Sequence, residues 1–246
     1  MKKSHYVMLC LGIECSLILF IAIACTLKSF GFALFYNIGY GVLMSIIVPL
    51  IASKKSVSSF GFKKLKIRQY TVLLLFVLFS VGGQLLPIML SGNSIQFDLI
   101  PICIIPLIMT TFFEEFLFRG FIQRQLEHKF GWGIAIFFSG LFFSLYHLGY
   151  PGFRSVEDLL LLFAVGIGFA IAFKLSDNNL IVSYFVNLPN AIITYMLKSK
   201  QFPVLTWTSS LYAAITIIIV ILIFFYYIKK RQVIIEIRRK NYGATN

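Results

Sequence analysis

Two adjacent carboxylates and an arginine close a strongly apolar stretch of this sequence. Glu114 and Glu115 follow the run 98–113, and Arg119 comes four residues after Glu115. An ionised side chain near the centre of a membrane helix costs about 2.5–3.5 kcal/mol on insertion scales, so this pair requires partners, water or a function. The alternative interpretation places all three residues at a helix end, in the headgroup region, with Arg119 as a cytoplasmic stop signal.

The spacing gives the two glutamates different neighbours. On an α-helix, Glu115 and Arg119 share a face, so an ion pair between them is expected. Glu114 points about 100° away and shares its face with Phe118. One carboxylate can therefore be held by the arginine while the other serves as a general base. A purely structural role for the Glu115–Arg119 pair is compatible with this interpretation.

Three further polar residues lie inside apolar segments. His147 ends the run 142–147 and has an aromatic residue, Phe143, one turn before it. Asn187 and Asn190 lie in the segment 180–191. Taken singly, such a histidine is interfacial or hydrogen-bonded, and buried amides usually hydrogen-bond across helices. Amides are also suited to hold the oxyanion of a tetrahedral intermediate.

Together these side chains outline a hydrolytic site. Glu114 or Glu115 could take a proton from water, and His147 could hold that water. Asn187 and Asn190 could stabilise the oxyanion. If a divalent metal such as zinc is used, Glu114 and His147 are suitable ligands. The HExxH signature of common zinc proteases is absent, and the chain has three histidines.

Composition predicts an all-α, polytopic membrane helix bundle. Hydrophobic residues make up 59% of the 246 residues and charged residues 13%, against about 25% charged in soluble domains. Apolar runs long enough to cross a bilayer give eight expected spans. They are 7–27, 32–52, 70–91, 98–118, 131–148, 157–174, 179–197 and 209–228. We expect one transmembrane domain, 1–246. Glu14, in the first span, either pairs within the bundle or marks a partner surface.

The placement of the net charge of +13 is explained by the membrane topology and does not require a nucleic-acid partner. With the N-terminus inside, only four of the 22 basic residues fall in the loops on the other side; these are Lys28, Arg154, Lys198 and Lys200. This bias predicts that both termini are cytoplasmic. The loop 53–70 and a basic cytoplasmic tail, 229–246, then lie against anionic lipid. We therefore expect the lipid bilayer, and no nucleic acid, as a partner.

The motifs resemble those of a known family. Glu114-Glu115-x-x-x-Arg119 and Phe143-x-x-x-His147 are similar to the first two motifs of the CAAX prenyl protease and bacteriocin-processing family, also called Abi. The resemblance covers about 110–195. It implies an intramembrane peptidase whose catalytic pocket opens toward the cytoplasm, and a cofactor that is either a metal or none.

The third motif departs from the family pattern, which is a histidine followed four residues later by an asparagine. The stretch 180–191 aligns by its apolar lead-in and Ser183. Asn187 then stands at the histidine position and Ala191 at the asparagine position. Asn190 lies one residue early, and it could serve from there if Pro189 distorts the helix.

The sequence thus predicts an endopeptidase of a bacterial plasma membrane, acting on a short peptide precursor or a lipidated protein tail. The resemblance also suggests bacteriocin or pheromone processing, or self-immunity. A catalytically impaired scaffold or regulator that binds a partner in the same pocket is the main alternative. A small transporter is a weaker one, because no inverted repeat or paired broken helices are evident.

Overall fold

The computed structural model describes residues 3–91, 95–197 and 204–243. Over these residues the chain is helical and contains no strand. The elements are α1 (Lys3–Ala24), α2 (Ser29–Ala33), η1 (Leu34–Ile47), α3 (Val48–Ser53), η2 (Val57–Phe60), α4 (Ile67–Ser91), η3 (Phe97–Leu99), α5 (Ile100–Glu114), η4 (Glu115–Gln123), α6 (Arg124–Phe130), α7 (Trp132–Leu145), η5 (Tyr146–Gly149), α8 (Val156–Leu175), α9 (Leu180–Leu197) and α10 (Trp207–Gly243).

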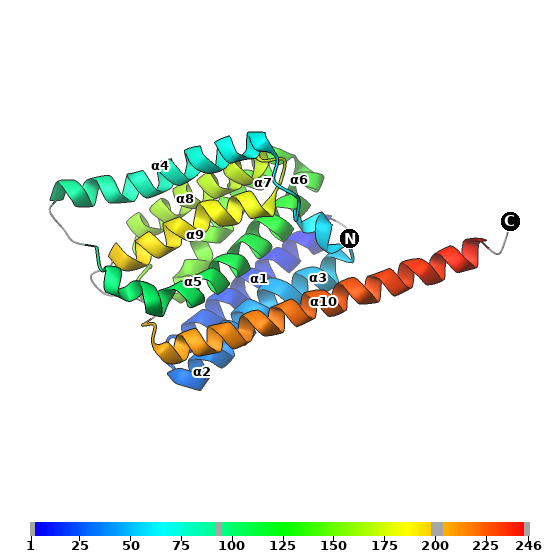
Figure 1. Ribbon diagram of the computed structural model, residues 1–246, viewed down its shortest axis with the longest axis horizontal. Coiled ribbons are helices and arrows are strands. Elements are labelled where there is room, and N and C mark those ends of the chain that lie inside the picture. Colours follow the sequence, from blue (N-terminus) through cyan, green and yellow to red (C-terminus); the bar gives the residue numbers. More distant parts are fainter. Residues whose placement is uncertain (1–2, 92–94, 198–203, 244–246) are drawn as a thin grey trace.

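The described residues contain eight helices that are long and apolar enough to cross a membrane, as expected. They pack side by side as a bundle (Figure 1). Short segments merge into longer spans: α2, η1 and α3 form one from Ser29 to Ser53. The all-α membrane architecture is confirmed, and the chain is a multi-pass membrane protein.

The fourth span is longer than predicted. We expected it to end at residue 118, but η3, α5, η4 and α6 form one helical run, Phe97–Phe130. The polar residues in the middle of this run, Glu114, Glu115, Arg119 and Gln123, are buried by the surrounding protein, so hydropathy falls while the helix continues. Interpreting Glu114, Glu115 and Arg119 as helix-end residues is therefore wrong.

Both ends of the chain lie toward the same end of the bundle. In Figure 1, α1 begins and α10 ends on the right, and α10 extends past the other helices. We call this the terminal end. The turns that follow α3, α6 and α8 also lie there, whereas the loop between η5 and α8 and the start of α10 lie at the opposite end.

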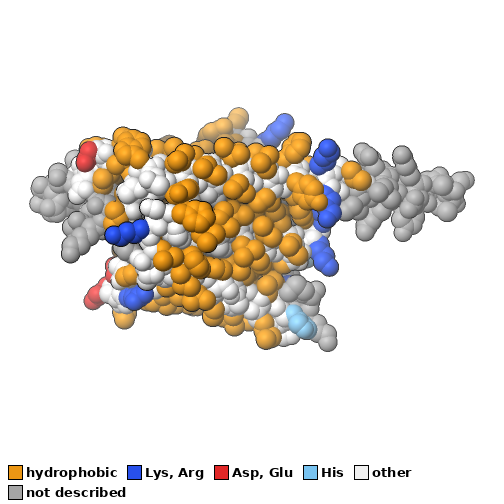
Figure 2. Space-filling view, turned by 90° about the horizontal axis from the view of Figure 1, so that it is seen from below, with side chains coloured by type: hydrophobic (Ala, Val, Ile, Leu, Met, Phe, Trp, Pro, Cys, Tyr) orange, Lys and Arg blue, Asp and Glu red, His pale blue; other side chains and the backbone are white. Residues whose placement is uncertain are grey.

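Figure 2 shows an apolar belt between the two ends of the bundle; basic side chains lie at both ends and gather at the terminal end. Arg119 does not belong to this group, although we counted it among the cytoplasmic residues, because its side chain is fully buried in the bundle. Lys2, Lys198 and Lys200 lie outside the described residues, as do the last three residues of the tail 229–246.

The core surrounds the Phe97–Phe130 helix. The phenylalanines on either side of Glu114 and Glu115, Phe113 and Phe116, are fully buried. The Phe116 ring stacks on Phe60 of η2 with 4.6 Å between centroids. Phe113 lies so close to Gly41 of η1 that a β-carbon at Gly41 would be 2.0 Å from the phenylalanine ring. The two glutamates are therefore held on a tightly packed element.

Candidate active site

Backbone geometry changes at the two glutamates. Glu114 is the last residue of the α-helix α5, and Glu115 is the first residue of η4, a nine-residue π-helical segment. π-Helical segments are rare and frequently occur at functional sites. The wider turn alters which residues share a face, an effect that hydropathy does not reveal.

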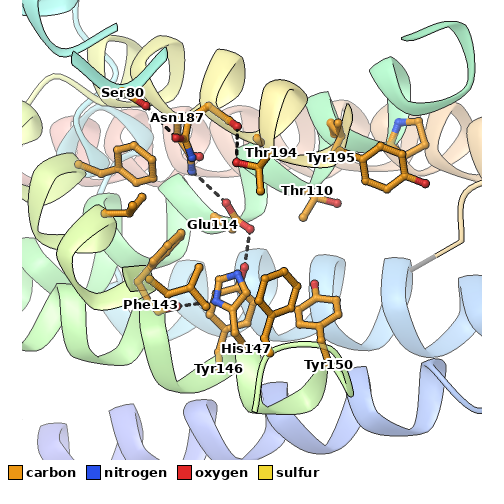
Figure 3. Close-up of a pocket in the computed structure, with 18 of the residues that line it drawn as sticks. Ser80, Thr110, Glu114, Phe143, Tyr146, His147, Tyr150, Asn187, Thr194 and Tyr195 are labelled. Carbon is orange, nitrogen blue, oxygen red and sulfur yellow. Dashed lines mark hydrogen bonds between the residues drawn. The ribbon is translucent and has the colours of Figure 1, made fainter. Parts of the chain in front are cut away.

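Glu114 lies at the centre of the site (Figure 3). Its side chain is 8% exposed and lines the larger cavity of the bundle. Tyr146 donates a hydrogen bond from its hydroxyl to Glu114 Oε1. Asn187 Nδ2 donates to the other carboxyl oxygen, Oε2, at 2.9 Å. The carboxyl group is thus oriented from two sides and still borders open space.

Glu115 faces away from that cavity and is completely buried. Ser183 donates from its hydroxyl to Glu115 Oε2, and Asn187 Nδ2 donates to Oε1 at 2.9 Å. Arg119 Nε lies 3.6 Å from Glu115 Oε2. The expected ion pair between Glu115 and Arg119 is present, and it is enclosed by protein.

Arg119 connects the glutamates to α7 and α8. Its Nη2 donates to the carbonyl oxygen of Gly166 at 2.9 Å. Its guanidinium carbon lies 4.6 Å from the centroid of the Phe143 ring and 5.4 Å from that of Phe169. Such cation–π contacts stabilise a desolvated guanidinium. Phe143, the aromatic residue of the second motif, thus contacts the arginine of the first.

Asn187 bridges the two carboxylates. Its side chain is 2% exposed, and its single amide nitrogen donates to Glu114 and to Glu115. Both N–H bonds are occupied in this arrangement, because a primary amide has two donors. The residue at the family's histidine position therefore orients the carboxylates, and it offers no further donor to an oxyanion.

His147 lies beside the cavity in η5, the short 3₁₀ segment that ends α7. Its Nδ1 is 2.8 Å from the carbonyl oxygen of Phe143. A carbonyl oxygen only accepts, so Nδ1 carries the proton in this contact, and the lone pair of the neutral ring is on Nε2. The ring centroid lies 4.1 Å from that of Tyr146, which donates to Glu114.

Asn190 also lines the cavity, on the side of α4. Its Oδ1 accepts from Ser80 Oγ at 2.8 Å and from Gln84 Nε2. With the amide oxygen engaged, Nδ2 is the end that could donate to a substrate. All six predicted site residues thus gather in one region of the bundle, although Glu115 and Arg119 do not border the cavity.

The cavity has a volume of about 610 Å³ and extends from Glu114 away from the terminal end. On the Phe97–Phe130 helix, its lining ends at Glu114 and includes nothing further along. On α9 and α10 it is formed by the second half of α9, from Val186, and by the start of α10, as far as Ala213. Most of the lining is apolar.

The direction in which the cavity extends bears on two expectations from the sequence. The charge bias predicts that the termini are cytoplasmic, and the family resemblance implies a pocket that opens toward the cytoplasm. The cavity lies toward the end of the bundle opposite the termini. The two expectations therefore assign the cytoplasm to opposite ends of the bundle, and both stay predictions.

The donor set does not match a zinc site. Within residues 3–91, 95–197 and 204–243, no group of three or more His, Cys, Asp and Glu side chains is arranged to hold a metal ion. Catalytic zinc usually takes three protein ligands. Glu114 and His147 supply two such side chains beside the cavity, and the third position of the motif is an amide. We therefore derive no step through a metal.

Glu14 meets neither expectation that we had for it. Its side chain is 4% exposed, so it does not mark a partner surface. Neither carboxyl oxygen has a hydrogen-bond partner among the residues that the structure describes. It does not line the cavity that contains Glu114.

Sequence reasoning missed the hydroxyl groups of the site. Tyr146 directly precedes His147, and Ser183 lies one helical turn before Asn187, on the same face. These positions relative to His147 and Asn187 are the sequence features that could have identified the two hydroxyl groups. A second hydroxyl pair, Tyr36 and Tyr150, lies farther along the cavity with 2.7 Å between the oxygens. Its partners come from segments 114 residues apart, so spacing does not predict it.

Residues 96–188 match the model of the Rce1-like family, described as type II CAAX prenyl endopeptidases. Over these residues the chain is similar to the CAAX protease family. The match contains both glutamates, Arg119, His147 and Asn187, and it ends before Asn190. No curated protein matches the chain.

This similarity supports peptidase chemistry in general terms. The family's motif residues lie together around a cavity within the membrane-spanning bundle, the location that an intramembrane peptidase requires. A bilayer and a peptide substrate are the corresponding partners in general terms.

Proposed function

We propose that this protein is an intramembrane endopeptidase that hydrolyses a peptide bond in a small peptide precursor or in the tail of a membrane-associated protein. One observation carries the proposal. Of the two motif glutamates, only Glu114 borders the cavity, while Glu115 is enclosed with Arg119. This division gives one carboxylate access to water and the other a positioning role.

The chemistry follows from these positions. Glu114 takes a proton from a water molecule in the cavity, and the resulting hydroxide attacks the scissile carbonyl carbon. Glu114 then returns the proton to the leaving amine as the carbon–nitrogen bond breaks. His147, beside Tyr146, holds the water. Asn190 Nδ2 is the side-chain donor best placed to stabilise the oxyanion.

Glu115 acts through Asn187, and Arg119 through Glu115, rather than on the substrate. The Glu115 carboxylate accepts one Asn187 N–H bond, which directs the other to Glu114. Arg119 compensates the charge of Glu115 in a buried site. These residues are therefore positioning residues.

A catalytically impaired scaffold or regulator is the second candidate, and the third motif favours it. Asn187 replaces an imidazole, and Ala191 removes a side-chain amide from the same helix. In that case the cavity binds a partner without cleaving it. If the protein is instead an active peptidase, we propose that it lies in a bacterial plasma membrane and cleaves a bacteriocin or pheromone precursor, or confers self-immunity to a bacteriocin.

The deciding experiment is cleavage of a fluorogenic peptide library by purified protein. We expect wild type to cleave, and Glu114→Ala and His147→Ala to be inactive at unchanged thermal stability. A chelator arm tests dependence on a divalent metal directly. Full activity of folded Glu114→Ala would contradict the proposal. Absence of cleavage by wild type, with a partner still bound in the cavity, would favour the scaffold.

A further inference from the structure

The cavity that contains Glu114 reaches the lipid-facing surface between α4 and α8. Phe79 of α4 and Leu161 of α8 both line it, and they are 81% and 65% exposed. Gly83 and Gly168, which also line it, have no atom within 4 Å of a β-carbon built on them. In a membrane these exposed apolar side chains contact lipid, so the cavity has a lateral mouth.

Polar contacts anchor α4, which forms one side of this mouth. At the terminal end, Gln69 Nε2 donates to the carbonyl oxygen of Ser176, just after α8, at 2.7 Å. Farther along, α4 is attached to α9, where Ser80 contacts Asn190 and Gln84 contacts Thr194 at 2.9 Å. The helix is therefore fixed along one edge, and its α8-facing edge borders the cavity.

The charge distribution indicates which leaflet the mouth faces. The loop between α3 and α4, the helix α6, the last turn of α8 and the second half of α10 carry most of the described basic residues, all toward the terminal end (Figure 2). The opposite end has Lys28 and Arg154. By the positive-inside rule the terminal end is cytoplasmic. The cavity extends toward the other end.

We propose that the substrate enters sideways from the leaflet opposite the cytoplasm, through the mouth between α4 and α8. The fitting substrate class is a peptide whose scissile bond adjoins an apolar, membrane-embedded segment. That segment occupies the apolar part of the cavity, and the scissile bond reaches Glu114 at its inner end. The substrate's cleavage rests on the proposed peptidase function, whereas the route of entry rests on the cavity and the charges.

Sidedness is tested without reference to activity. In a Cys25→Ala background, Ser209→Cys places a thiol in the cavity, and Ser59→Cys places one at the terminal end. We expect a membrane-impermeant maleimide to label Ser209→Cys in intact cells, and Ser59→Cys only after permeabilisation. The reverse pattern, or no labelling of Ser209→Cys in intact cells, would overturn the proposed leaflet.

The mouth is tested with neighbouring glycines. Gly82 and Gly83 both have open space around a built β-carbon, but only Gly83 lines the cavity. We expect Gly83→Trp to abolish photo-crosslinking of an N-acylated synthetic peptide added to right-side-out vesicles, and Gly82→Trp to leave it unchanged. Equal crosslinking by both variants would overturn the entry route. If crosslinking follows this pattern but the peptide is not cleaved, the entry route is supported and the proposed peptidase function is contradicted.

A separate, polar cavity lies at the terminal end of the bundle. It has a volume of about 430 Å³, and its lining includes Lys55, Arg124 and His128. Its acidic residue, Glu127, is already engaged by Lys174 and by Asn178 Nδ2. Lys55 and Arg124 thus share this cavity with a single carboxylate that also pairs with Lys174, so the lining is electropositive.

One observation indicates a missing acceptor in this polar cavity. Arg124 Nη1 is buried and has no hydrogen-bond partner among the described residues. An anion in the cavity would satisfy this guanidinium nitrogen.

We infer that this polar cavity binds a phosphate group, through Arg124 and Lys55. The group belongs either to an anionic lipid at the cytoplasmic surface or to a soluble phosphate, because both present the same acceptor oxygens. Basic cavities between membrane helices commonly bind lipid headgroups in this way.

Thermal shift in a neutral detergent distinguishes the two sources. We expect short-chain phosphatidylglycerol to raise the melting temperature of wild type and of Lys54→Gln, whose exposed side chain lies outside the cavity. Arg124→Gln and Lys55→Gln should lose that shift. The same pattern with inorganic phosphate would identify a soluble ligand. No shift with either probe, or equal shifts in all variants, would overturn the inference.

Discussion

Glu114 and Glu115 are adjacent in the chain, yet their surroundings differ. Glu114 borders open space, while Glu115 is surrounded by Ser183, Asn187 and Arg119. At the scale of single residues, this difference separates a group that can act on a substrate from one that maintains the site. Substitutions of the two should therefore have different consequences.

We predict that Glu115→Gln destabilises the protein and that Glu114→Gln mainly abolishes activity. Removing one partner of a buried ion pair costs about 3–5 kcal/mol, because the remaining charge is left uncompensated. Arg119 would be that charge. Thermal unfolding in detergent and peptide cleavage, measured on both variants, check this. Equal losses of stability would contradict the division of roles.

Glu14 is a buried carboxyl with no hydrogen-bond partner among the described residues. We predict that Glu14→Met stabilises the protein, because it removes a buried polar group whose burial costs about 1–3 kcal/mol when unpaired. The measurement is the thermal unfolding midpoint, with cleavage as a control. A clear loss of stability would show that Glu14 has a partner that the described contacts do not include.

At the scale of elements, the position of Glu114 depends on close packing between η1 and α5. Gly41 of η1 is the contact point, because a β-carbon there would overlap the ring of Phe113. Phe113 directly precedes Glu114, so displacement of its ring would also displace the carboxylate. The absence of a side chain at Gly41 thus contributes to the geometry of the site.

We predict that Gly41→Ala lowers stability by about 1–3 kcal/mol, the usual cost of overpacking, and that it also lowers activity. Gly12→Ala is the matched control, because nothing lies within 4 Å of a β-carbon at that position of α1. That control should be neutral or stabilising by about 0.5–1 kcal/mol. If both variants unfold at the wild-type temperature, the contact does not constrain the helix.

At the scale of the whole molecule, the end at which the termini lie decides the orientation of the cavity. We predict that green fluorescent protein fused after residue 246 is fluorescent and that alkaline phosphatase fused there is inactive. Phosphatase inserted at Gly152, in the exposed loop at the opposite end, should be active. Reporter assays on whole cells check this. The reverse pattern would place the termini outside and the cavity toward the cytoplasm.

Hydropathy and charge by themselves determined the class of architecture. Eight apolar runs, interrupted by short basic or polar loops, allow only a membrane bundle, because backbone groups in lipid must be satisfied within each segment. The same reasoning predicted that the fourth span ends at residue 118, whereas the helix continues to Phe130. It treats Arg119 as exposed to lipid or water, whereas the guanidinium is enclosed by Glu115, Gly166 and aromatic rings.

The charged and amide side chains of the candidate site could be proposed from the sequence, since such groups within membrane spans are few, whereas its hydroxyl groups were missed. The different roles of Glu114 and Glu115 could not be predicted from the sequence. Tyr146, Ser183 and Asn187 reach the two glutamates from α9 and the end of α7, and contacts across 32 to 73 residues leave no periodic trace in the sequence.

The sequence alone therefore determined that the chain spans a membrane and carries the motifs of a CAAX protease, because composition and local spacing encode both. Only the tertiary structure decided which glutamate meets the cavity and toward which end of the bundle that cavity extends. Those properties depend on how helices distant in sequence pack, and on the π-helical turn that begins at Glu115.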